Sequence, residues 1–395
     1  MEIMQEIIET YLEKYLPRKD IIHRLPVSLP ISKVWPELQK ARKDKSESLP
    51  LLSIDGKPFW WVLTESISSQ ADEVISLARR EIVFDRPEYE EAFREAVLDE
   101  AVYSSVIEGA FTTKKEAREF IHEGRSPKNK SEQMVKSNYE ALTYVLEHID
   151  ESITEQTIFD IYALVTKDTL EADVPTNAYR SESVFVQSSR GEIVHTAPEA
   201  EKVSGMMASL LEFITNNELS PLIKACIAHF YFVYVHPFID GNGRTARALS
   251  FMMLLQAGYD FFRYFSISGV IAEERAKYYK AIKDVEDDDF DMTYFIDYYT
   301  GMLARAVKAM EERLVDKVVL EQTLDKLKAA GMNKRIIEGA KWILTSPNQS
   351  ITIKAWQKKF GVVLETARQD LFKLEDAGIV HRKLVKRQYV FEVKK

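Results

Sequence analysis

A short glycine-flanked turn between two long apolar helix patterns sets the architecture of this chain. One apolar helical pattern runs from Leu222 to Val235, and a second resumes at Ala246. Between them the chain reads His-Pro-Phe-Ile-Asp-Gly-Asn-Gly-Arg-Thr, residues 236–245. Glycines permit a sharp turn and a close backbone approach, and the free N–H groups and dipole of the second helix attract anions. The pattern therefore predicts two packed helices joined by an anion-binding turn.

The polar side chains of this turn suit a site for a metal-bound polyphosphate beside an attacking hydroxyl. Arg244 and Arg247 are three residues apart on the second helix, so both can reach the same phosphate chain. Asp240 stands just before the turn, where a carboxylate can hold Mg²⁺ against phosphates. His236 is the only group of the motif that is an effective base at neutral pH. We expect Phe238 to pack into the core and fix the loop.

The stretch from His236 to Arg247 resembles the motif of the Fic family, His-x-Phe-x-Asp/Glu-Gly-Asn-Gly-Arg-x-x-Arg, at every fixed position. The alternative is a helix-capping turn with surface arginines. The resemblance implies a mainly α Fic-type helical bundle that transfers AMP from ATP, with Mg²⁺, to a Ser, Thr or Tyr hydroxyl of a target protein. It implies that His236 deprotonates this hydroxyl and that Asp240 carries the metal. The residues it implies for nucleotide binding are Gly241, Asn242, Gly243, Arg244, Thr245 and Arg247.

A second segment, residues 104–109, resembles the inhibitory pattern of the same family, Ser/Thr-x-x-x-Glu-Gly/Asn. Apolar residues at helical spacing predict a helix that ends at Gly109. Ser104 and Glu108 are four residues apart and share one face of it. The resemblance implies that Glu108 pairs with Arg247 and so removes this arginine from the terminal phosphate. The alternative is an ordinary surface ion pair. A water positioned by Glu108 would also support the reverse reaction, removal of AMP.

Two short β-rich runs, residues 184–186 and 193–194, flank a polar turn and predict a hairpin. The hairpin lies where the Fic family carries a flap that docks the target backbone by β-augmentation. The resemblance thus implies that the target protein docks at residues 183–197, and four residues would line the site edge: Val186, Gln187, Ser188 and Ser189. The alternative is a hairpin that only caps a helical bundle. We interpret His195, a histidine near a proline, as polar surface.

The pair Tyr278 and Tyr279 resembles the tyrosines that lie beside adenosine in the family. Their rings would offer an apolar wall with a polar edge to the base and ribose. Core packing is the alternative. Glu286 stands where many relatives have asparagine, so the remaining adenosine contacts are left undefined.

The chain divides into segments of different character, and 395 residues predict two to three domains. We expect an N-terminal helix and Pro-rich segment (1–60), a Fic catalytic domain (61–303, with the inhibitory helix around 98–109), a connecting helix (304–334) and a C-terminal domain (335–395). The last segment resembles winged helix-turn-helix domains. Its residues 351–395 hold eleven Lys and Arg against five acidic residues. This charge favours DNA contact, whereas Glu365 and Asp370 on the expected recognition helix oppose it, so DNA and protein partners both stay open.

Composition narrows the classes of protein to which this chain can belong. The single cysteine, Cys226, cannot form an intramolecular disulfide and is expected in the core. The first 16 residues lack the basic region and long apolar core of a signal peptide, and no run reaches transmembrane length. We therefore expect a soluble cytoplasmic protein without membrane contact, with a homo-oligomer left open. The two functional hypotheses are a self-inhibited AMP transferase and a nucleotide-sensing regulator with little transferase activity, which binds DNA or protein.

Overall fold

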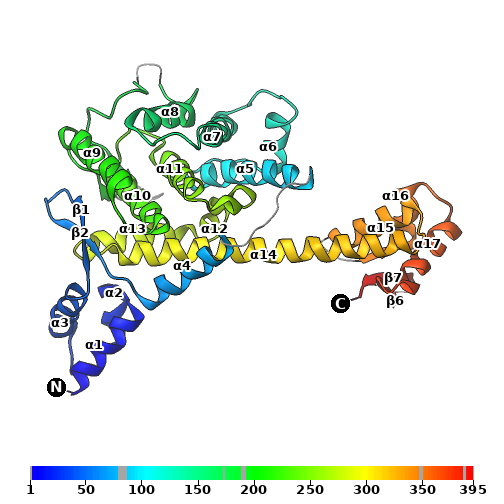
Figure 1. Ribbon diagram of the computed structural model, residues 1–395, viewed down its shortest axis with the longest axis horizontal. Helices are drawn as coiled ribbons and strands as arrows, with labels where there is room; N and C mark the ends of the chain where they lie inside the picture. Colours follow the sequence, from blue (N-terminus) through cyan, green and yellow to red (C-terminus); the bar gives the residue numbers. More distant parts are fainter. Residues whose placement is uncertain are drawn as a thin grey trace. The chain divides into compact units, whose positions relative to one another are not determined.

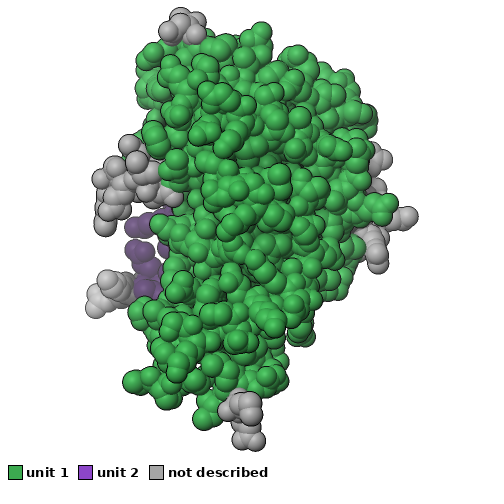
Figure 2. Space-filling view, turned by 90° about the vertical axis from the view of Figure 1, so that its left-hand side faces the viewer, with its two compact units in different colours: residues 1–308 green, residues 309–395 purple. Residues whose placement is uncertain are grey.

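The computed structural model describes residues 2–78, 87–171, 174–187, 193–346, 350–385 and 388–394. The chain forms two compact units, Met1–Lys308 and Ala309–Lys395 (Figure 2). Most of the described residues are helical, so the predicted mainly α class is confirmed. Unit 1 contains both the predicted N-terminal segment and the predicted catalytic domain. Among the described residues, no helix has the length and apolar character needed to cross a membrane.

The N-terminal part of unit 1 is a small helical layer with a two-stranded sheet. Its elements are α1 (Glu2–Lys14), α2 (Arg18–Ile21), η1 (Ile22–Arg24), α3 (Ile31–Lys43), β1 (Glu47–Leu52) and β2 (Pro58–Trp61). Tyr11, Ile21, Trp35 and Leu38 form its apolar core. Arg42 is buried at the end of α3 and donates to the hydroxyl of Tyr294, which fastens this layer to the rest of the unit.

The remainder of unit 1 is a helical bundle around α10 and α11 (Figure 1). Nearly every side chain of these two helices is buried: α10 is apolar on all sides, whereas α11 also buries Asn242, Arg244 and Arg247. The bundle comprises α4 (Glu65–Ala78), α5 (Pro87–Ile107), α6 (Lys114–Ile121), α7 (Lys130–Glu147), α8 (Glu155–Thr166), α9 (Ala200–Asn216), α10 (Pro221–Val235), α11 (Asn242–Gln256), η2 (Asp260–Tyr264), α12 (Ile267–Glu273), α13 (Arg275–Asp287) and the start of α14 (Thr293–Ala329).

The predicted hairpin is present between α8 and α9. Strands β3 (Phe185–Gln187) and β4 (Ile193–Thr196) pair antiparallel, with Val186 opposite His195 and an irregularity after Val186. The predicted edge residues Val186 and Gln187 belong to β3. Ser188 and Ser189 lie outside the described residues.

Unit 2 begins within α14 and holds three further helices and a three-stranded sheet. These are α15 (Lys334–Thr345), β5 (Ser350–Thr352), α16 (Ile353–Phe360), α17 (Leu364–Asp376), β6 (Val380–Val385) and β7 (Gln388–Val393), with strand order β5-β7-β6. The three helices and the β6–β7 hairpin agree with the predicted order of elements, whereas the three-residue strand β5 carries no pattern and was not predicted. Assignment to the winged helix-turn-helix class stays a prediction.

The expectation that Asp370 opposes DNA contact from the surface of its helix was wrong. Its carboxylate is buried rather than presented on the surface of α17. It accepts two hydrogen bonds from Arg335, at 2.7 and 3.0 Å, and one from the indole of Trp356 at 3.0 Å. The cause is helical spacing, because Asp370 lies on the same face as the buried Ala367 and Leu374. Asp370 is therefore a structural residue of unit 2.

Candidate functional site

The turn that carries His236 begins where α10 ends. His236 adopts a left-handed conformation, φ 50°, and its backbone N–H donates to Phe232. Its ring Nδ1 lies 3.2 Å from the carbonyl oxygen of Val233. A carbonyl only accepts, so Nδ1 carries the proton and Nε2 is left as an acceptor. The turn thus fixes the tautomer that a general base needs.

Burial lowers the pKa of His236 to about 4, against the opposing effect of its hydrogen bond to Val233. The charge of His195 lowers this pKa further. Removing a charged group from water disfavours its charged form, so the ring is neutral at pH 7. A neutral imidazole can accept a proton, which is the task of a base.

Two residues of the motif hold the loop in shape. Phe238 is buried and stacks on Tyr162, with ring centroids 3.6 Å apart, as the sequence predicted. The side chain of Asn242 accepts from the N–H of Phe238 at 2.9 Å and donates to its carbonyl at 2.8 Å. Asn242 would therefore meet a phosphate through its backbone N–H rather than through its side chain.

The start of α11 has the form of an anion site. Gly241 precedes the helix in a left-handed conformation, φ 79°, and a Cβ there would lie 2.7 Å from a methyl carbon of Thr166. Glycine is therefore required at this position. The first intrahelical bond runs from the N–H of Thr245 to the carbonyl of Gly241, so the N–H groups before it have no acceptor within the helix.

Two buried arginines of α11 carry donors that nothing in the described chain satisfies. Nη1 of Arg244 donates to the carbonyl of Val165 at 2.8 Å, while its Nε and Nη2 have no hydrogen-bond partner among the described residues. The same holds for Nη1 of Arg247 and for the hydroxyl of Thr245. A buried unsatisfied donor costs about 1–3 kcal/mol, more when charged. A polyphosphate would supply the missing acceptors.

Asp240 lies at the mouth of this site with its side chain about half exposed, 47%. It accepts from the N–H of Gly241 at 2.6 Å and lies 3.7 Å from Nη2 of Arg244. Mg²⁺ in nucleotide sites is held by one or two carboxylates together with phosphate oxygens and water. Asp240 fits this pattern. Within the described ranges, no group of three or more His, Cys, Asp or Glu could hold a metal without a nucleotide.

The end of α5 and the residue directly after it, Glu108, contact Arg247. Nε of Arg247 donates to the hydroxyl of Ser104 at 2.8 Å, and Nη2 donates to the carbonyl of the same serine at 2.8 Å. Nη2 also donates to Oε1 of Glu108 at 2.9 Å. Two of the three nitrogens of Arg247 are thus held by α5, and only Nη1 is left for another partner.

The two tyrosines of α13 differ in burial. Tyr278 is 1% exposed, and its hydroxyl lies 2.9 Å from Nε2 of His229 in the core. Burial lowers the pKa of His229, so this ring is neutral and shares one hydrogen bond with the tyrosine. Tyr279 is 37% exposed and donates to the carbonyl of Ile107, the last residue of α5. Only Tyr279 therefore offers a ring surface to a ligand.

Two residues near the site were not anticipated. Arg180 donates from Nε to the carbonyl of His236 at 2.8 Å. The interpretation of His195 as polar surface was wrong, because the ring is buried between Glu286 and the carbonyl of Tyr234. Local pattern could not find either, since their partners are 39 to 91 positions away along the chain.

Comparison with known proteins agrees with this geometry. Residues 152–254, which include the whole motif, match the model of the Fic/DOC family. The chain is 30% identical over 208 residues to a protein adenylyltransferase Fic of Nematostella vectensis, covering 50% of this chain and 45% of that protein. It is 26% identical over 236 residues to the Drosophila erecta protein of the same name, covering 57% and 43%. The chain thus spans less than half the length of these curated relatives.

A solved structure shares the fold. The crystal structure of a Fic family protein from Desulfovibrio desulfuricans superposes with a TM-score of 0.56 at 21% identity. The match covers 85% of this chain and 98% of that one. The Fic architecture predicted from the motif is thereby confirmed.

Proposed function

We propose that this protein is an adenylyltransferase that moves AMP from ATP to a Ser, Thr or Tyr hydroxyl of a target protein. The observation that carries the proposal is the neutral ring of His236, with Nε2 as an acceptor, on the turn that leads into the anion site of α11. The unsatisfied donors of Arg244 and Arg247 support a polyphosphate as the other substrate. The names of the curated relatives favour the same chemistry.

The reaction follows from these groups. Nε2 of His236 takes the proton of the acceptor hydroxyl, whose oxygen bonds to the α-phosphorus of ATP. The bond from this phosphorus to the bridging oxygen breaks, and pyrophosphate leaves. The N–H groups at the start of α11 and the free nitrogens of Arg244 stabilise the charge that develops on the phosphates. Mg²⁺ held by Asp240 would neutralise part of that charge.

The contact between α5 and Arg247 makes the transferase self-inhibited. Glu108 and Ser104 hold Nη2 and Nε of Arg247, so the arginine cannot turn its full guanidinium to a terminal phosphate. The carboxylate also places negative charge beside the anion site, which repels a polyphosphate. By positioning a water, Glu108 would serve the reverse reaction, removal of AMP from a modified target.

The hairpin is the docking place of the target in this proposal. A two-stranded hairpin leaves edges to which an extended segment of another protein can add as a strand. Phe185 of β3 is half exposed and would contact a side chain of that segment. The buried His195 of β4 fixes the hairpin to the bundle that carries His236.

The proposal is tested by incorporation of α-phosphate-labelled ATP with Mg²⁺, followed by intact mass. The proteins compared are the wild type, Glu108→Gly, and Glu108→Gly combined with His236→Ala. Addition of AMP by Glu108→Gly, weak in the wild type and absent without His236, is the expected result. Label from the γ- but not the α-phosphate would replace the proposal with kinase chemistry. ATP binding with no label in any variant would favour the nucleotide-sensing regulator.

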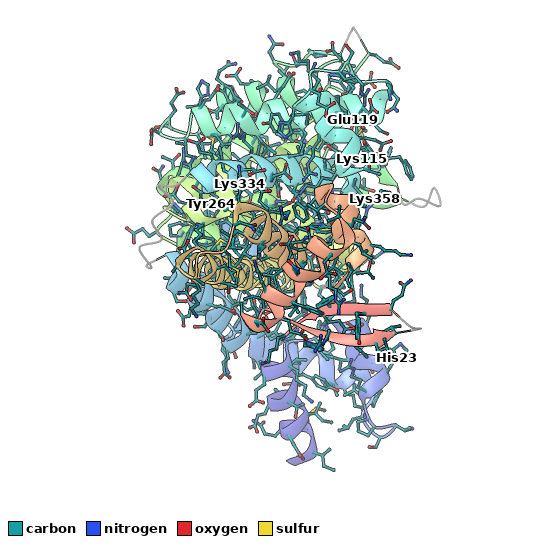
Figure 3. The ribbon with its side chains drawn as sticks, turned by 90° about the vertical axis from the view of Figure 1, so that its right-hand side faces the viewer. His23, Lys115, Glu119, Tyr264, Lys334 and Lys358 are labelled. Carbon is teal, nitrogen blue, oxygen red and sulfur yellow. The ribbon has the colours of Figure 1, made fainter. Side chains whose placement is uncertain are left out.

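A second candidate function is contact of unit 2 with DNA. Burial of Asp370 removes one of the two acids that opposed it, and α17 exposes Arg368, Gln369 and Lys373 beside Glu365. Lys334 of α15 and Lys358 of α16 add exposed positive charge (Figure 3). Exposed cations of this kind bind phosphates without sequence preference.

Anisotropy of a labelled DNA duplex with the full chain tests this candidate at several salt concentrations. The double variant Arg368→Ala, Lys373→Ala should weaken binding and reduce the salt dependence by about two phosphate contacts. The matched control replaces two exposed lysines of α3, Lys33 and Lys40. Equal binding by both variants would remove α17 as the contact surface.

A further inference from the structure

The end of α10 is held by the segment that leads into and out of the hairpin. The last carbonyls of a helix have no partner within it and carry the negative end of its dipole. Here four consecutive carbonyls accept hydrogen bonds from Arg180 and His195. They are those of Tyr234, Val235, His236 and Pro237. The main chain on both sides of His236 is therefore fixed from outside the motif.

Arg180 makes most of these contacts. It is buried, and Nε donates to the carbonyl of His236 at 2.8 Å while its backbone N–H donates to Pro237 at 2.9 Å. Nη2 donates to Pro198 at 2.6 Å and Nη1 to Glu182 at 2.8 Å, both to backbone carbonyls. The guanidinium thus ties the entry and the exit of the hairpin to the turn of the base.

His195 makes the remaining contact, and its two ring nitrogens face two acceptors. Nε2 lies 2.8 Å from the carbonyl of Tyr234 on α10. Nδ1 lies 2.9 and 3.0 Å from the two carboxylate oxygens of Glu286 on α13. A neutral imidazole has only one N–H, and neither a carbonyl nor a carboxylate donates. The pair of His195 and Glu286 must therefore hold one extra proton for both hydrogen bonds to exist.

The charged and titratable groups around this pair come from α13, from the end of α10 and from the loop before β3. Glu286 faces it from α13, and the ring of Tyr234 lies 5.3 Å away on α10. His236 directly follows α10. It interacts electrostatically with His195 of β4 and with Arg180, which precedes β3. Within the described part of the chain, Glu286 is the only carboxylate in hydrogen-bond contact with His195.

We propose that His195 and Glu286 form a proton-holding latch that positions His236 by fixing strand β4 to the end of α10. The base and the hairpin that would dock the target then move as one body. This inference rests on the proposed transferase function for its kinetic consequence, but the latch itself does not.

Glutamine at position 286 offers a sharp test. Its amide N–H would donate to Nδ1 of a neutral His195, whose Nε2–H still reaches Tyr234, so both bonds survive without the extra proton. Glu286→Ala loses the contact altogether. In the Glu108→Gly background, Glu286→Ala should lower kcat for AMP transfer about tenfold or more, since small misplacements of a base are costly. Glu286→Gln should recover most of this loss.

A measurement that does not depend on AMP transfer separates the test of the latch from the test of the proposed function. Nitrogen NMR of the histidine rings should show two slowly exchanging N–H protons at His195, assigned by their absence in His195→Gln. Glu286→Gln should show one. The ring signals of His236 should shift in Glu286→Ala and stay near their parent values in Glu286→Gln. His148→Gln is the matched control, because this histidine also bonds a carbonyl but caps the end of α7, away from the latch in sequence.

The outcomes are distinct. Unmoved His236 signals in Glu286→Ala would overturn the latch whatever the activity. Equal kinetic effects of Glu286→Ala and Glu286→Gln would overturn it as well. The expected NMR pattern without any AMP transfer would leave the latch established and reject the proposed function.

Discussion

A Cβ built on Gly243 would lie 2.1 Å from Oε1 of Glu108, so this carboxylate occupies the space directly against the first turn of α11. The same oxygen accepts a hydrogen bond from Arg247. A phosphate that approached the turn at Gly243 would meet both the bulk and the charge of the glutamate. The two obstacles are separable by mutation.

Glu108→Gly removes bulk and charge, whereas Glu108→Gln removes the charge and keeps the bulk. We expect Glu108→Gly to raise the initial rate of AMP transfer by roughly tenfold or more, because a charge-assisted phosphate contact of Arg247 becomes available. Glu108→Gln should give a smaller increase. Rates with labelled ATP measure both. If neither variant exceeds the wild type, the contact with Arg247 is not inhibitory.

Asn242→Ala should destabilise the fold as well as the site. The substitution leaves the N–H and the carbonyl of Phe238 without their partners in a buried place. An unpaired buried group costs about 1–3 kcal/mol, so the free energy of unfolding of unit 1 in urea should fall by that amount and the midpoint should move to lower urea. Asn242→Asp keeps the acceptor for the N–H and should cost less than alanine. A change within about 0.5 kcal/mol for Asn242→Ala would contradict this role.

The sequence allowed prediction of the parts of the site that are local. Helical spacing placed Arg244 and Arg247 together, and the glycines marked the turn before α11. The contact of Asn242 with Phe238 also spans only four positions, although the motif alone did not show that the side chain serves the loop. Such features follow from neighbours in the chain, whose geometry secondary structure fixes.

Contacts between distant segments could not be predicted. Arg180 reaches His236 across 56 positions, and His195 reaches Glu286 across 91, so no periodicity connects them. A buried cation that binds only carbonyls has the same local pattern as one on the surface. Asp370 was misplaced for the same reason, because its partner Arg335 lies 35 positions away on another helix.

Replacement of Asp370 should unfold unit 2 preferentially. Asp370→Ala leaves the buried indole N–H of Trp356 without its acceptor, which costs about 1–3 kcal/mol, and leaves the partly exposed guanidinium of Arg335 to water. Asp370→Asn keeps one acceptor oxygen and should cost less. Hydrogen exchange in the full chain measures both, with faster exchange expected in α15, α16 and α17. Unchanged protection of these helices in Asp370→Ala would contradict the structural role.

The acid side of the pH profile should report the low pKa of His236. Burial lowers this pKa to about 4, from an unfolded value near 6.5. The base therefore stays neutral as the pH falls, and AMP transfer by Glu108→Gly should decline only as the pH approaches about 4. The folded state binds fewer protons than the unfolded one in this range, so the contribution of His236 to stability is full above about pH 6.5 and is lost toward pH 4. Single-turnover rates across this range measure the decline, and His236→Gln should remain inactive throughout. A decline centred near pH 6.5 would mean that the ring is open to water when it acts.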